Sequence, residues 1–260
     1  MKLEDIKLPK TQENDLNDIP HAGKAFAKSI VGFNPINDHQ TITADDGAWQ
    51  QLVRAYLATC SFADANVGRI LTALEKSPHA NNTIIILWGD HGWHLGEKEH
   101  WRKMSLWERG TKTPFIIKMP NTNGNTQNIE APVSLQDIFP TLVDLCKLKV
   151  TQQLDGNSLK PLLTNPDTKW DKPVIISHGP GNFAVRQDHW RLIRYADGSE
   201  ELYDLSKDAH EFTNLANQAD HKKTLSELRS HLPKTWPYIM GPRFKKFSDS
   251  FSPPPKQQKK

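Results

Sequence analysis

The sequence predicts an α/β fold in which a mixed sheet is flanked by helices and is followed by a small antiparallel α+β subdomain. The first observation is the apolar run IIILW at residues 84–88, which is rich in β-branched residues and typical of a strand buried on both faces of a parallel sheet. The second is the helical periodicity of apolar residues across residues 46–76. The third is a series of short strand patterns, separated by turn signals, after Lys172.

The composition is that of a globular protein with enough apolar residues for a substantial core. The chain has 260 residues, of which 37% are hydrophobic and 24% are charged, and its formal net charge is +3. This length fits one larger domain or two smaller ones. Lys and Arg are not concentrated on one element with interleaved aromatics, which argues against nucleic-acid binding. No apolar run approaches the length of a membrane-spanning helix, and two cysteines provide no disulfide framework.

One long helix is expected near the amino terminus. Residues 1–42 are polar, contain three prolines and show no sustained period, so we expect them to form a surface-wrapping or disordered lead-in. Thr43 and Asp46 can form a capping box for the helix at residues 46–76, and Pro78 ends that helix.

A strand, a loop and a second strand should follow this helix. The strands are expected at residues 83–89 and 114–119, and the loop between them is rich in Trp, His, Glu and Arg. Residues 121–128 form a polar loop tip. Asp137 is then expected to be the N-cap of a helix that continues to about residue 148, with Pro140 in its first turn.

The remaining residues are expected to form a small antiparallel sheet closed by one helix. A hairpin turn signal, Ala-Asp-Gly-Ser, occupies residues 196–199, and the helix lies near residues 221–232. Residues 248–260 are rich in Pro, Lys and Gln and are expected to be a disordered tail. The strands of the sheet are expected at residues 174–177, 183–186, 190–195 and 201–203.

Asp90 and His91 stand directly after the first predicted strand. Ligand sites in open α/β sheets lie just outside the carboxyl ends of such strands. A carboxylate oxygen suits calcium or magnesium, whereas an imidazole also suits zinc or manganese, so the residue types leave the identity of the ion open. Lys103, on the loop that follows, supplies a point charge for an anion. Four aromatic residues of the same loop can shape a substrate pocket: Trp93, His94, His100 and Trp101.

This loop resembles the sulfatases of the alkaline-phosphatase-like superfamily, most closely the iduronate-2-sulfatase and choline-sulfatase branch. The family pattern is Asp-His-Gly-x-x-Leu-Gly-Glu, then an aromatic residue, a Lys, a Ser and a Pro-containing strand. It is matched at residues 90–97, Trp101, Lys103, Ser105 and residues 113–115. Other segments similar to family motifs are VSLQDIFPTL at 133–142, LDGNSLKPLL at 154–163, ELYDL at 201–205 and EFTNL at 211–215.

Three sulfatase motifs have no counterpart in this sequence. The family's nucleophile is a formylglycine made from the Cys of a Cys-x-(Pro/Ala)-Ser-Arg segment, and neither Cys60 nor Cys146 lies in such a segment. The Asp-Asp metal pair is missing, because Asp45 and Asp46 follow no apolar strand, and so is the Lys-Pro-His segment. The chain therefore resembles the carboxyl-terminal portion of a sulfatase, in which residues 43–171 belong to the catalytic domain and residues 172–247 form the small antiparallel subdomain.

The resemblance implies roles for five residues. Asp90 and His91 would bind one divalent cation, which would be calcium. Lys103 would be the catalytic lysine that contacts the sulfate group, and Trp93 and His100 would line the substrate site. Each residue type also has an ordinary alternative: an Asp can cap a turn, a loop Lys or His is often solvated, and a Trp can pack its own loop.

The function that the resemblance implies is sulfuric ester hydrolysis, with a sulfated carbohydrate or a small sulfate ester as substrate and with no nucleic acid or membrane as partner. Because the formylglycine motif is missing, we expect these residues to be inactive alone and the amino-terminal half of the same enzyme to be a partner. Two alternatives stay open: a non-catalytic remnant or anion- or metal-binding module, and a phosphoester or phosphonate hydrolase of the same superfamily. The first residues lack the apolar region of a signal peptide, although family members usually act in the periplasm or outside the cell.

Overall fold

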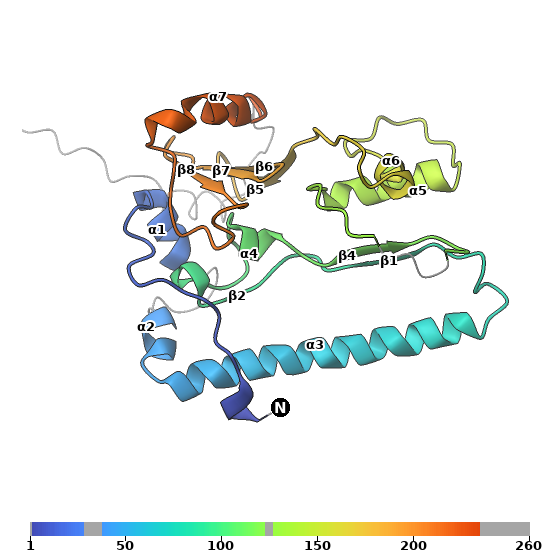
Figure 1. The fold of residues 1–260 in the computed structure, drawn as a ribbon, viewed down its shortest axis with the longest axis horizontal. Coiled ribbons are helices and arrows are strands. Elements are labelled where there is room, and N and C mark those ends of the chain that lie inside the picture. Colours follow the sequence, from blue (N-terminus) through green and yellow to red (C-terminus); the bar gives the residue numbers. More distant parts are fainter. Residues whose placement is uncertain (1, 29–37, 123–126, 235–260) are drawn as a thin grey trace, which may run out of the picture. The chain divides into compact units, whose positions relative to one another are not determined.

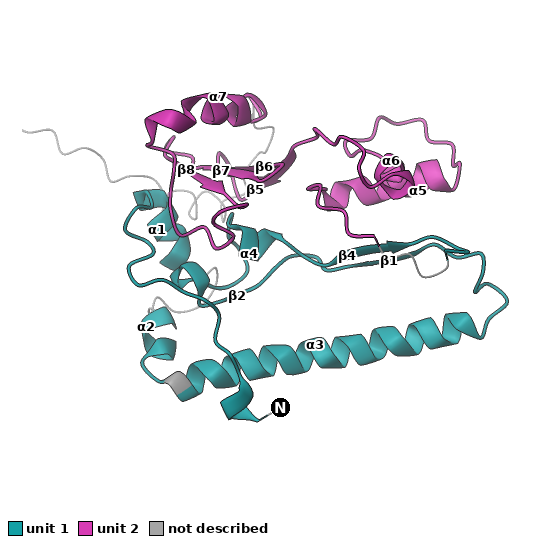
Figure 2. Cartoon of the chain, viewed as in Figure 1, with its two compact units in different colours: residues 1–124 teal, residues 125–260 magenta. Residues whose placement is uncertain are grey.

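The computed structural model describes residues 2–28, 38–122 and 127–234 (Figure 1). The chain divides into two compact units, residues 1–124 and residues 125–260 (Figure 2), and each is described by itself. The tail predicted at residues 248–260 lies outside the described residues, and the domain boundary expected near residue 172 stays a prediction. None of the described helices combines the length and the apolar character that a membrane crossing requires.

The first unit contains more structure in its lead-in than the sequence predicts. Ile6, Leu16, Ile19 and Phe26 are all buried, so the described part of residues 1–42 contributes to a core and is not a solvated segment. The prediction was wrong because these apolar residues are too widely spaced to show a period. The helices of this unit are η1 (Leu3–Asp5), α1 (His21–Lys28), α2 (Asp38–Thr43), α3 (Asp46–Glu75), η2 (Glu97–Glu99) and α4 (Glu108–Thr111).

The long helix α3 confirms the predicted helix but begins with a different cap. The carboxylate of Asp45 accepts a hydrogen bond from the Gly47 amide at 2.9 Å and so satisfies one of the free donors of the first turn. Thr43 does not take its expected part in a capping box, because it ends the preceding helix α2 and its hydroxyl donates to the His39 carbonyl at 2.7 Å.

The apolar face of α3 is covered only near its start. Trp49 and Val53 pack with Ile6 and Trp101 in one buried cluster. Further along the helix, Phe62 is 73% exposed and Ile70 is 69% exposed, so part of the later apolar surface lies open to solvent.

The strand predicted around the IIILW run exists, but its surroundings differ from the prediction. β1 (Ile85–Trp88) pairs antiparallel with β4 (Phe115–Lys118), because the chain reverses through the intervening loop and returns along the same edge. No other described strand pairs with β1, and Trp88 remains 49% exposed. The expectation of a strand buried on both faces within a parallel sheet is therefore wrong for the described chain. A second short pair, β2 (His94–Leu95) with β3 (Trp101–Arg102), lies within the loop.

The second unit begins with a capped helical segment. Ser134 and Asp137 form the capping box of η3 (Leu135–Asp137), so Ser134, and not Asp137, supplies the side-chain cap. The Asp137 carboxylate also accepts from the Asn157 amide at 2.7 Å, which ties the LDGNSL segment to this turn. Helix α5 (Ile138–Leu145) follows and ends earlier than predicted, and α6 (Lys160–Thr164) comes next.

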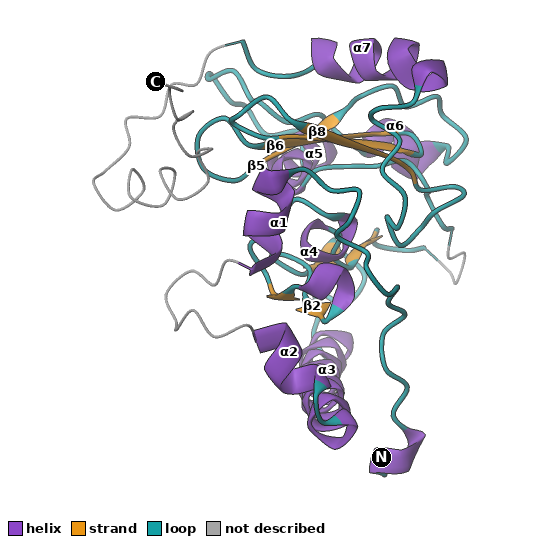
Figure 3. Ribbon diagram, turned by 90° about the vertical axis from the view of Figure 1, so that its left-hand side faces the viewer, coloured by secondary structure: helices purple, strands orange, loops and turns teal. Residues whose placement is uncertain are grey.

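The predicted antiparallel sheet is confirmed. Its strands run in the order β5, β6, β7, β8, each antiparallel to the next, and the hairpin turn at Gly198 (φ 86°) joins the last two. Helix α7 lies over one face of this sheet, where Leu225 and Leu228 pack on Val185, Leu192 and Leu202 (Figure 3). The bounds are β5 (Val174–Ser177), β6 (Phe183–Gln187), β7 (Trp190–Arg194), β8 (Glu200–Asp204), η4 (Ala219–His221) and α7 (Lys222–Ser230).

A buried carboxylate is enclosed by the same sheet. Glu201 is fully buried and accepts hydrogen bonds from the hydroxyls of Tyr195 and Tyr203, both at 2.6 Å. Burial, followed by the nearby Glu201 charge, raises the pKa of both tyrosines well above the usual value, so both phenols remain protonated donors. This network holds the strands in register from inside the sheet.

Truncating the core of the sheet should destabilise the chain. Leu202→Ala removes a fully buried side chain from the contact between β8 and α7, and we expect the free energy of unfolding to fall by about 2–5 kcal/mol. Ile175→Ala, on β5 of the same sheet but 39% exposed, should cost less than about 1 kcal/mol. Urea unfolding followed by circular dichroism measures both, and equal losses would contradict the packing described above.

Candidate functional site

The candidate site is built on the loop that leaves the carboxyl end of β1 and returns as β4. Its backbone is fixed at both ends: the Gly89 amide donates to the Pro114 carbonyl at 3.1 Å, and the Gly92 amide donates to the Gly110 carbonyl at 3.0 Å. A Cβ at residue 92 would lie 2.0 Å from the Arg109 carbonyl oxygen, so only glycine allows this contact. Asp90 and His91 are therefore held between two fixed points of the backbone.

Asp90 and His91 lie together as the sequence predicts, and their geometry favours a shared cation. The Nδ1 atom of His91 lies 2.8 Å from the Gly92 carbonyl oxygen, so this nitrogen carries the proton and donates. The opposite nitrogen, Nε2, lies 3.2 Å from Asp90 Oδ2, and in the neutral ring it carries the lone pair. Two acceptors that face each other at this distance suit a metal ion that binds both, with the carbonyl orienting the imidazole as is usual for ligating histidines.

The donor set of this pair is not a complete metal site. The described residues contain no group of three or more His, Cys, Asp and Glu side chains placed to hold an ion. Calcium takes six to eight oxygen ligands, and this pair supplies one carboxylate and one nitrogen. Asp90 and His91 can therefore form one side of a cation site, and further ligands have to come from elsewhere.

Trp93 lies beside this pair and contacts two aromatic rings. It stacks on His91, with ring centroids 6.3 Å apart, and on Tyr56 of α3, with centroids 6.2 Å apart. Tyr56 was missed as a site residue because its position fits the apolar period of the helix. Trp93 is half-buried, and its predicted substrate contact stays a prediction.

Lys103 has the exposure that its predicted role requires. Its side chain is exposed and forms no ion pair with any residue that the structure describes. The neighbours on either side, Arg102 (φ 72°) and Met104 (φ 68°), both have left-handed backbone conformations. No hydrogen bond, ion pair or ring contact joins Lys103 to Asp90 or His91 within the described chain.

His100 does not fit the predicted role in substrate binding. Its side chain is 2% exposed, and its Nδ1 and Nε2 atoms lie 3.0 Å from the Ala27 carbonyl oxygen and 2.8 Å from the Lys103 carbonyl oxygen. A carbonyl oxygen only accepts, so the neutral imidazole donates to one of these two carbonyls, and neither nitrogen is open to a substrate. Sequence reasoning could not separate this arrangement from an exposed loop histidine, because the Ala27 partner is distant in the sequence.

His94 is likewise buried within the loop. Its Nδ1 lies 3.2 Å from the Glu97 carbonyl oxygen and its Nε2 lies 2.7 Å from Ser105 Oγ. Since a carbonyl only accepts, Nδ1 donates and Nε2 accepts from the Ser105 hydroxyl. The His94 and His100 rings meet edge to face, with centroids 4.9 Å apart.

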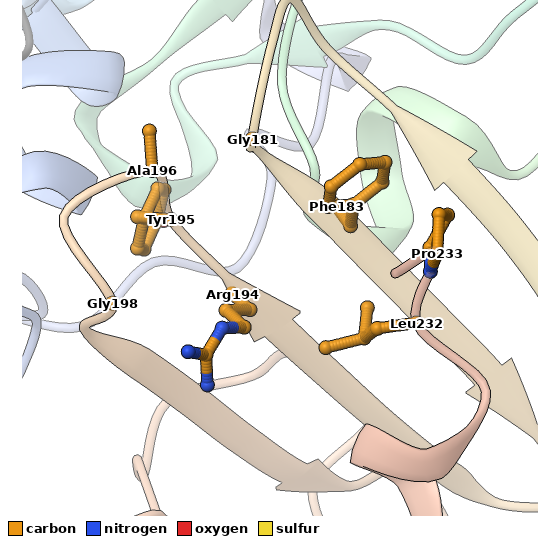
Figure 4. Close-up of a pocket in the computed structure, with 8 residues that line it drawn as sticks. All are labelled: Gly181, Phe183, Arg194, Tyr195, Ala196, Gly198, Leu232 and Pro233. Atoms are coloured by element: carbon orange, nitrogen blue, oxygen red, sulfur yellow. The ribbon is translucent and has the colours of Figure 1, made fainter. Parts of the chain in front are cut away.

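A pocket of about 200 Å³ in the second unit contains none of the predicted site residues (Figure 4). It is lined by Phe183, Arg194 and Leu232, among others, and Arg194 is bound to Glu200 at 2.7 Å. The charge of Arg194 is thus already matched, and nothing in this pocket suggests the predicted chemistry.

A side chain at residue 92 should disrupt the candidate site. Gly92→Ala places a Cβ against the Arg109 carbonyl, and we expect an unfolding free energy lower by about 2 kcal/mol or more. Gly68→Ala, in the interior of α3 with open space around it, should instead stabilise the chain by up to about 1 kcal/mol. If the loop closes as described, urea unfolding should show a lower unfolding free energy for Gly92→Ala and a higher one for Gly68→Ala.

The two buried histidines should make stability depend on pH. Burial lowers the pKa of His94 well below its usual 6.5 and also lowers the pKa of His100. The unfolded chain therefore binds more protons than the folded chain below pH 6.5, and the unfolding free energy should fall as the pH drops through that value, by up to about 1.4 kcal/mol per pH unit for each histidine. Urea midpoints between pH 7.5 and 5 measure this slope. His100→Gln should reduce it, whereas the exposed His79→Ala should not.

Comparisons with known proteins identify a family for both halves of the chain. The profile described as Sulfatase matches residues 15–148, and the profile described as N-sulphoglucosamine sulphohydrolase, C-terminal, matches residues 96–236. A protein named Sulfatase from Formosa agariphila is 39% identical over 233 residues, which is 90% of this chain and 45% of the relative. Arylsulfatase K of Gallus gallus is 35% identical over 180 residues, covering 62% of this chain and 33% of the relative. The chain thus spans less than half the length of these curated relatives.

Solved structures give the same result for the fold. A 2-O GAG sulfatase aligns with a TM-score of 0.71 at 24% identity, over 86% of this chain and 51% of that chain. A protein solved in complex with its substrate, D-glucosamine-2-N,6-O-disulfate, aligns with a TM-score of 0.59 at 27% identity. The alignment covers 78% of this chain and 42% of that chain. The phosphonate monoester hydrolase of Agrobacterium radiobacter aligns with a TM-score of 0.60 at 26% identity, over 72% of this chain and 42% of that chain. The profile match and these neighbours together establish that the chain belongs to the sulfatase family and has the alkaline-phosphatase-like fold.

Proposed function

We propose that this chain forms part of a sulfuric ester hydrolase, in which Asp90 and His91 hold one divalent cation and Lys103 binds the sulfate group. The observation that carries the proposal is the lone pair of His91 Nε2 facing Asp90 Oδ2 at 3.2 Å, at the end of β1. Calcium is the ion that the family resemblance favours, although it needs further oxygen ligands.

The chemistry requires positive charge around an anion. When a sulfate ester is cleaved, negative charge grows on the leaving oxygen while the sulfate oxygens remain charged, so fixed cations lower the barrier. A bound divalent ion supplies Lewis-acid stabilisation of those oxygens. Lys103 adds a positive ammonium group on an exposed side chain, and the Gly92 carbonyl keeps the His91 imidazole in the orientation that leaves Nε2 free.

The nucleophile has to come from residues outside this sequence. The chain contains no Cys-x-(Pro/Ala)-Ser-Arg segment from which formylglycine could be made, and it spans 45% of the Formosa agariphila relative. Exposed apolar side chains on β1, β4 and α3 suit contact with the amino-terminal part of a sulfatase, which would supply the formylglycine and the remaining metal ligands. They include Trp88, Ile116, Phe62 and Ile70. These 260 residues alone should therefore show no turnover.

The substrate class that we favour is a sulfated carbohydrate. One structural neighbour, 27% identical to this chain, holds D-glucosamine-2-N,6-O-disulfate. The half-buried indole of Trp93 lies beside His91 and is an aromatic group of the kind that lines ligand pockets. A small sulfate ester fits the same positive charges. These two substrate classes correspond to the iduronate-2-sulfatase and choline-sulfatase branches that the sequence resembles.

Two alternative functions predict different coding sequence upstream of Met1. A phosphonate or phosphoester hydrolase is suggested by the Agrobacterium radiobacter neighbour and would carry a Thr or Ser nucleophile or favour phosphorus substrates. A non-catalytic anion- or metal-binding module would have no upstream nucleophile. Translating the coding sequence upstream of Met1 in all frames distinguishes the three.

Lys103 is the residue to test in a polypeptide that joins this chain to an upstream segment containing Cys-x-Pro-Ser-Arg. We expect Lys103→Ala to lower kcat/KM for a sulfate ester by about 10²- to 10³-fold, because a positive group near the reacting oxygens is lost. Lys112→Ala removes an exposed lysine at the end of the same loop and should leave kcat/KM unchanged. Equal effects of the two variants, or calcium-dependent turnover by the 260 residues alone, would overturn the proposal.

A further inference from the structure

The loop that carries Lys103 has an unusual backbone. Four non-glycine residues between Gly96 and Ser105 have positive φ: Lys98 (57°), Glu99 (49°), Arg102 (72°) and Met104 (68°). A left-handed conformation costs an L-residue about 1 kcal/mol or more, so this segment needs specific anchors to persist. Arg102 and Met104 flank Lys103 directly, and the position of the ammonium group depends on what holds this turn.

His100 is the anchor closest to Lys103. Its Nε2 lies 2.8 Å from the Lys103 carbonyl oxygen and its Nδ1 lies 3.0 Å from the carbonyl oxygen of Ala27, in the last turn of α1. Both partners only accept, and the neutral ring has one N–H, so the shorter contact assigns the proton to Nε2, which donates to the Lys103 carbonyl. The ring is 2% exposed and packs edge to face on His94 and Trp107, so it has little freedom to move.

Two further contacts close the turn on either side. The hydroxyl of Ser105 donates to His94 Nε2 at 2.7 Å, which fixes the chain just after Lys103. The ammonium group of Lys98 lies 2.8 Å from the Asp15 carboxylate, and both side chains are buried, which fixes the chain before it. His100 contacts the backbone of Lys103 itself.

We propose that His100 is a positioning residue for Lys103, and that it sets the place of the lysine ammonium by donating a hydrogen bond from its buried imidazole to the Lys103 carbonyl. This inference rests on the proposed sulfate-binding role of Lys103. It replaces the substrate contact expected for His100 from the sequence, and it makes the sulfate affinity of the loop dependent on a residue that touches no substrate.

A double-mutant cycle separates positioning from a general contribution to stability. In the joined polypeptide described above, kcat, KM and the inhibition constant of inorganic sulfate are measured for His100→Ala, Lys103→Ala and the double variant. We expect His100→Ala alone to weaken sulfate inhibition and lower kcat/KM by about tenfold or more, because a displacement near 1 Å of a binding group has effects of that size. In the Lys103→Ala background the same change should cost nothing further, because the group that it positions is absent.

Two controls keep the outcomes distinct. His79→Ala, an exposed histidine, should change none of these values, and His100→Gln, which can still donate one hydrogen bond to a carbonyl, should restore part of the loss if His100→Ala unfolds the chain. If Lys103→Ala has no effect, the proposed function fails and the positioning role fails with it. If Lys103→Ala is damaging but His100→Ala costs the same in both backgrounds, or nothing in either, the proposed function stands and the positioning role is wrong.

Discussion

The candidate site depends on one close approach of backbone to backbone. Gly92 donates to the Gly110 carbonyl at 3.0 Å, and a Cβ at residue 92 would lie 2.0 Å from the Arg109 carbonyl oxygen. This contact closes the loop between β1 and β4, so residues that β1 delivers to its carboxyl end stay there. It also places the Gly92 carbonyl 2.8 Å from His91 Nδ1, which fixes the tautomer that leaves Nε2 directed at Asp90. A packing constraint thus sets which His91 nitrogen faces Asp90 in the proposed cation site.

Inside the loop, buried hydrogen bonds and ion pairs hold the conformation that apolar packing holds in other parts of the fold. His94, His100, Lys98 and Asp15 are all buried, and each forms a hydrogen bond or ion pair of 3.2 Å or less. Buried polar groups are costly when they lack partners and specific when they have them, so such a network favours one conformation over its alternatives. It can hold the four left-handed residues that no apolar contact would select. The network is sensitive to acid, because protonating His94 or His100 would place a positive charge in a buried site.

Local patterns in the sequence predicted the elements better than their surroundings. The α3 period, the strand before Asp90, the hairpin turn at Gly198 and the antiparallel sheet all follow from short-range rules and are confirmed. The burial of β1 was wrong because it depends on neighbouring strands. The substrate role of His100 stays a prediction that its buried contact with Ala27, 73 positions away, does not favour. The cap at Asp45 was missed because the end of α2 competes for the Thr43 hydroxyl.

The exposed apolar side chains connect the fold to the proposed function. Isolated exposed apolar residues need no explanation, but here they recur on both elements that an α/β sheet normally buries, with Trp88 and Ile116 on the β1–β4 pair and Phe62 and Ile70 on α3. A paired strand with a free edge and an apolar face is a surface that other polypeptide covers. Trp88 ends β1 just before Asp90 and His91, which provide only part of a cation's ligands. Under the proposed function, one segment, the amino-terminal part of a sulfatase, would cover Trp88 and supply the remaining ligands, so that the site would form only when that segment is in place.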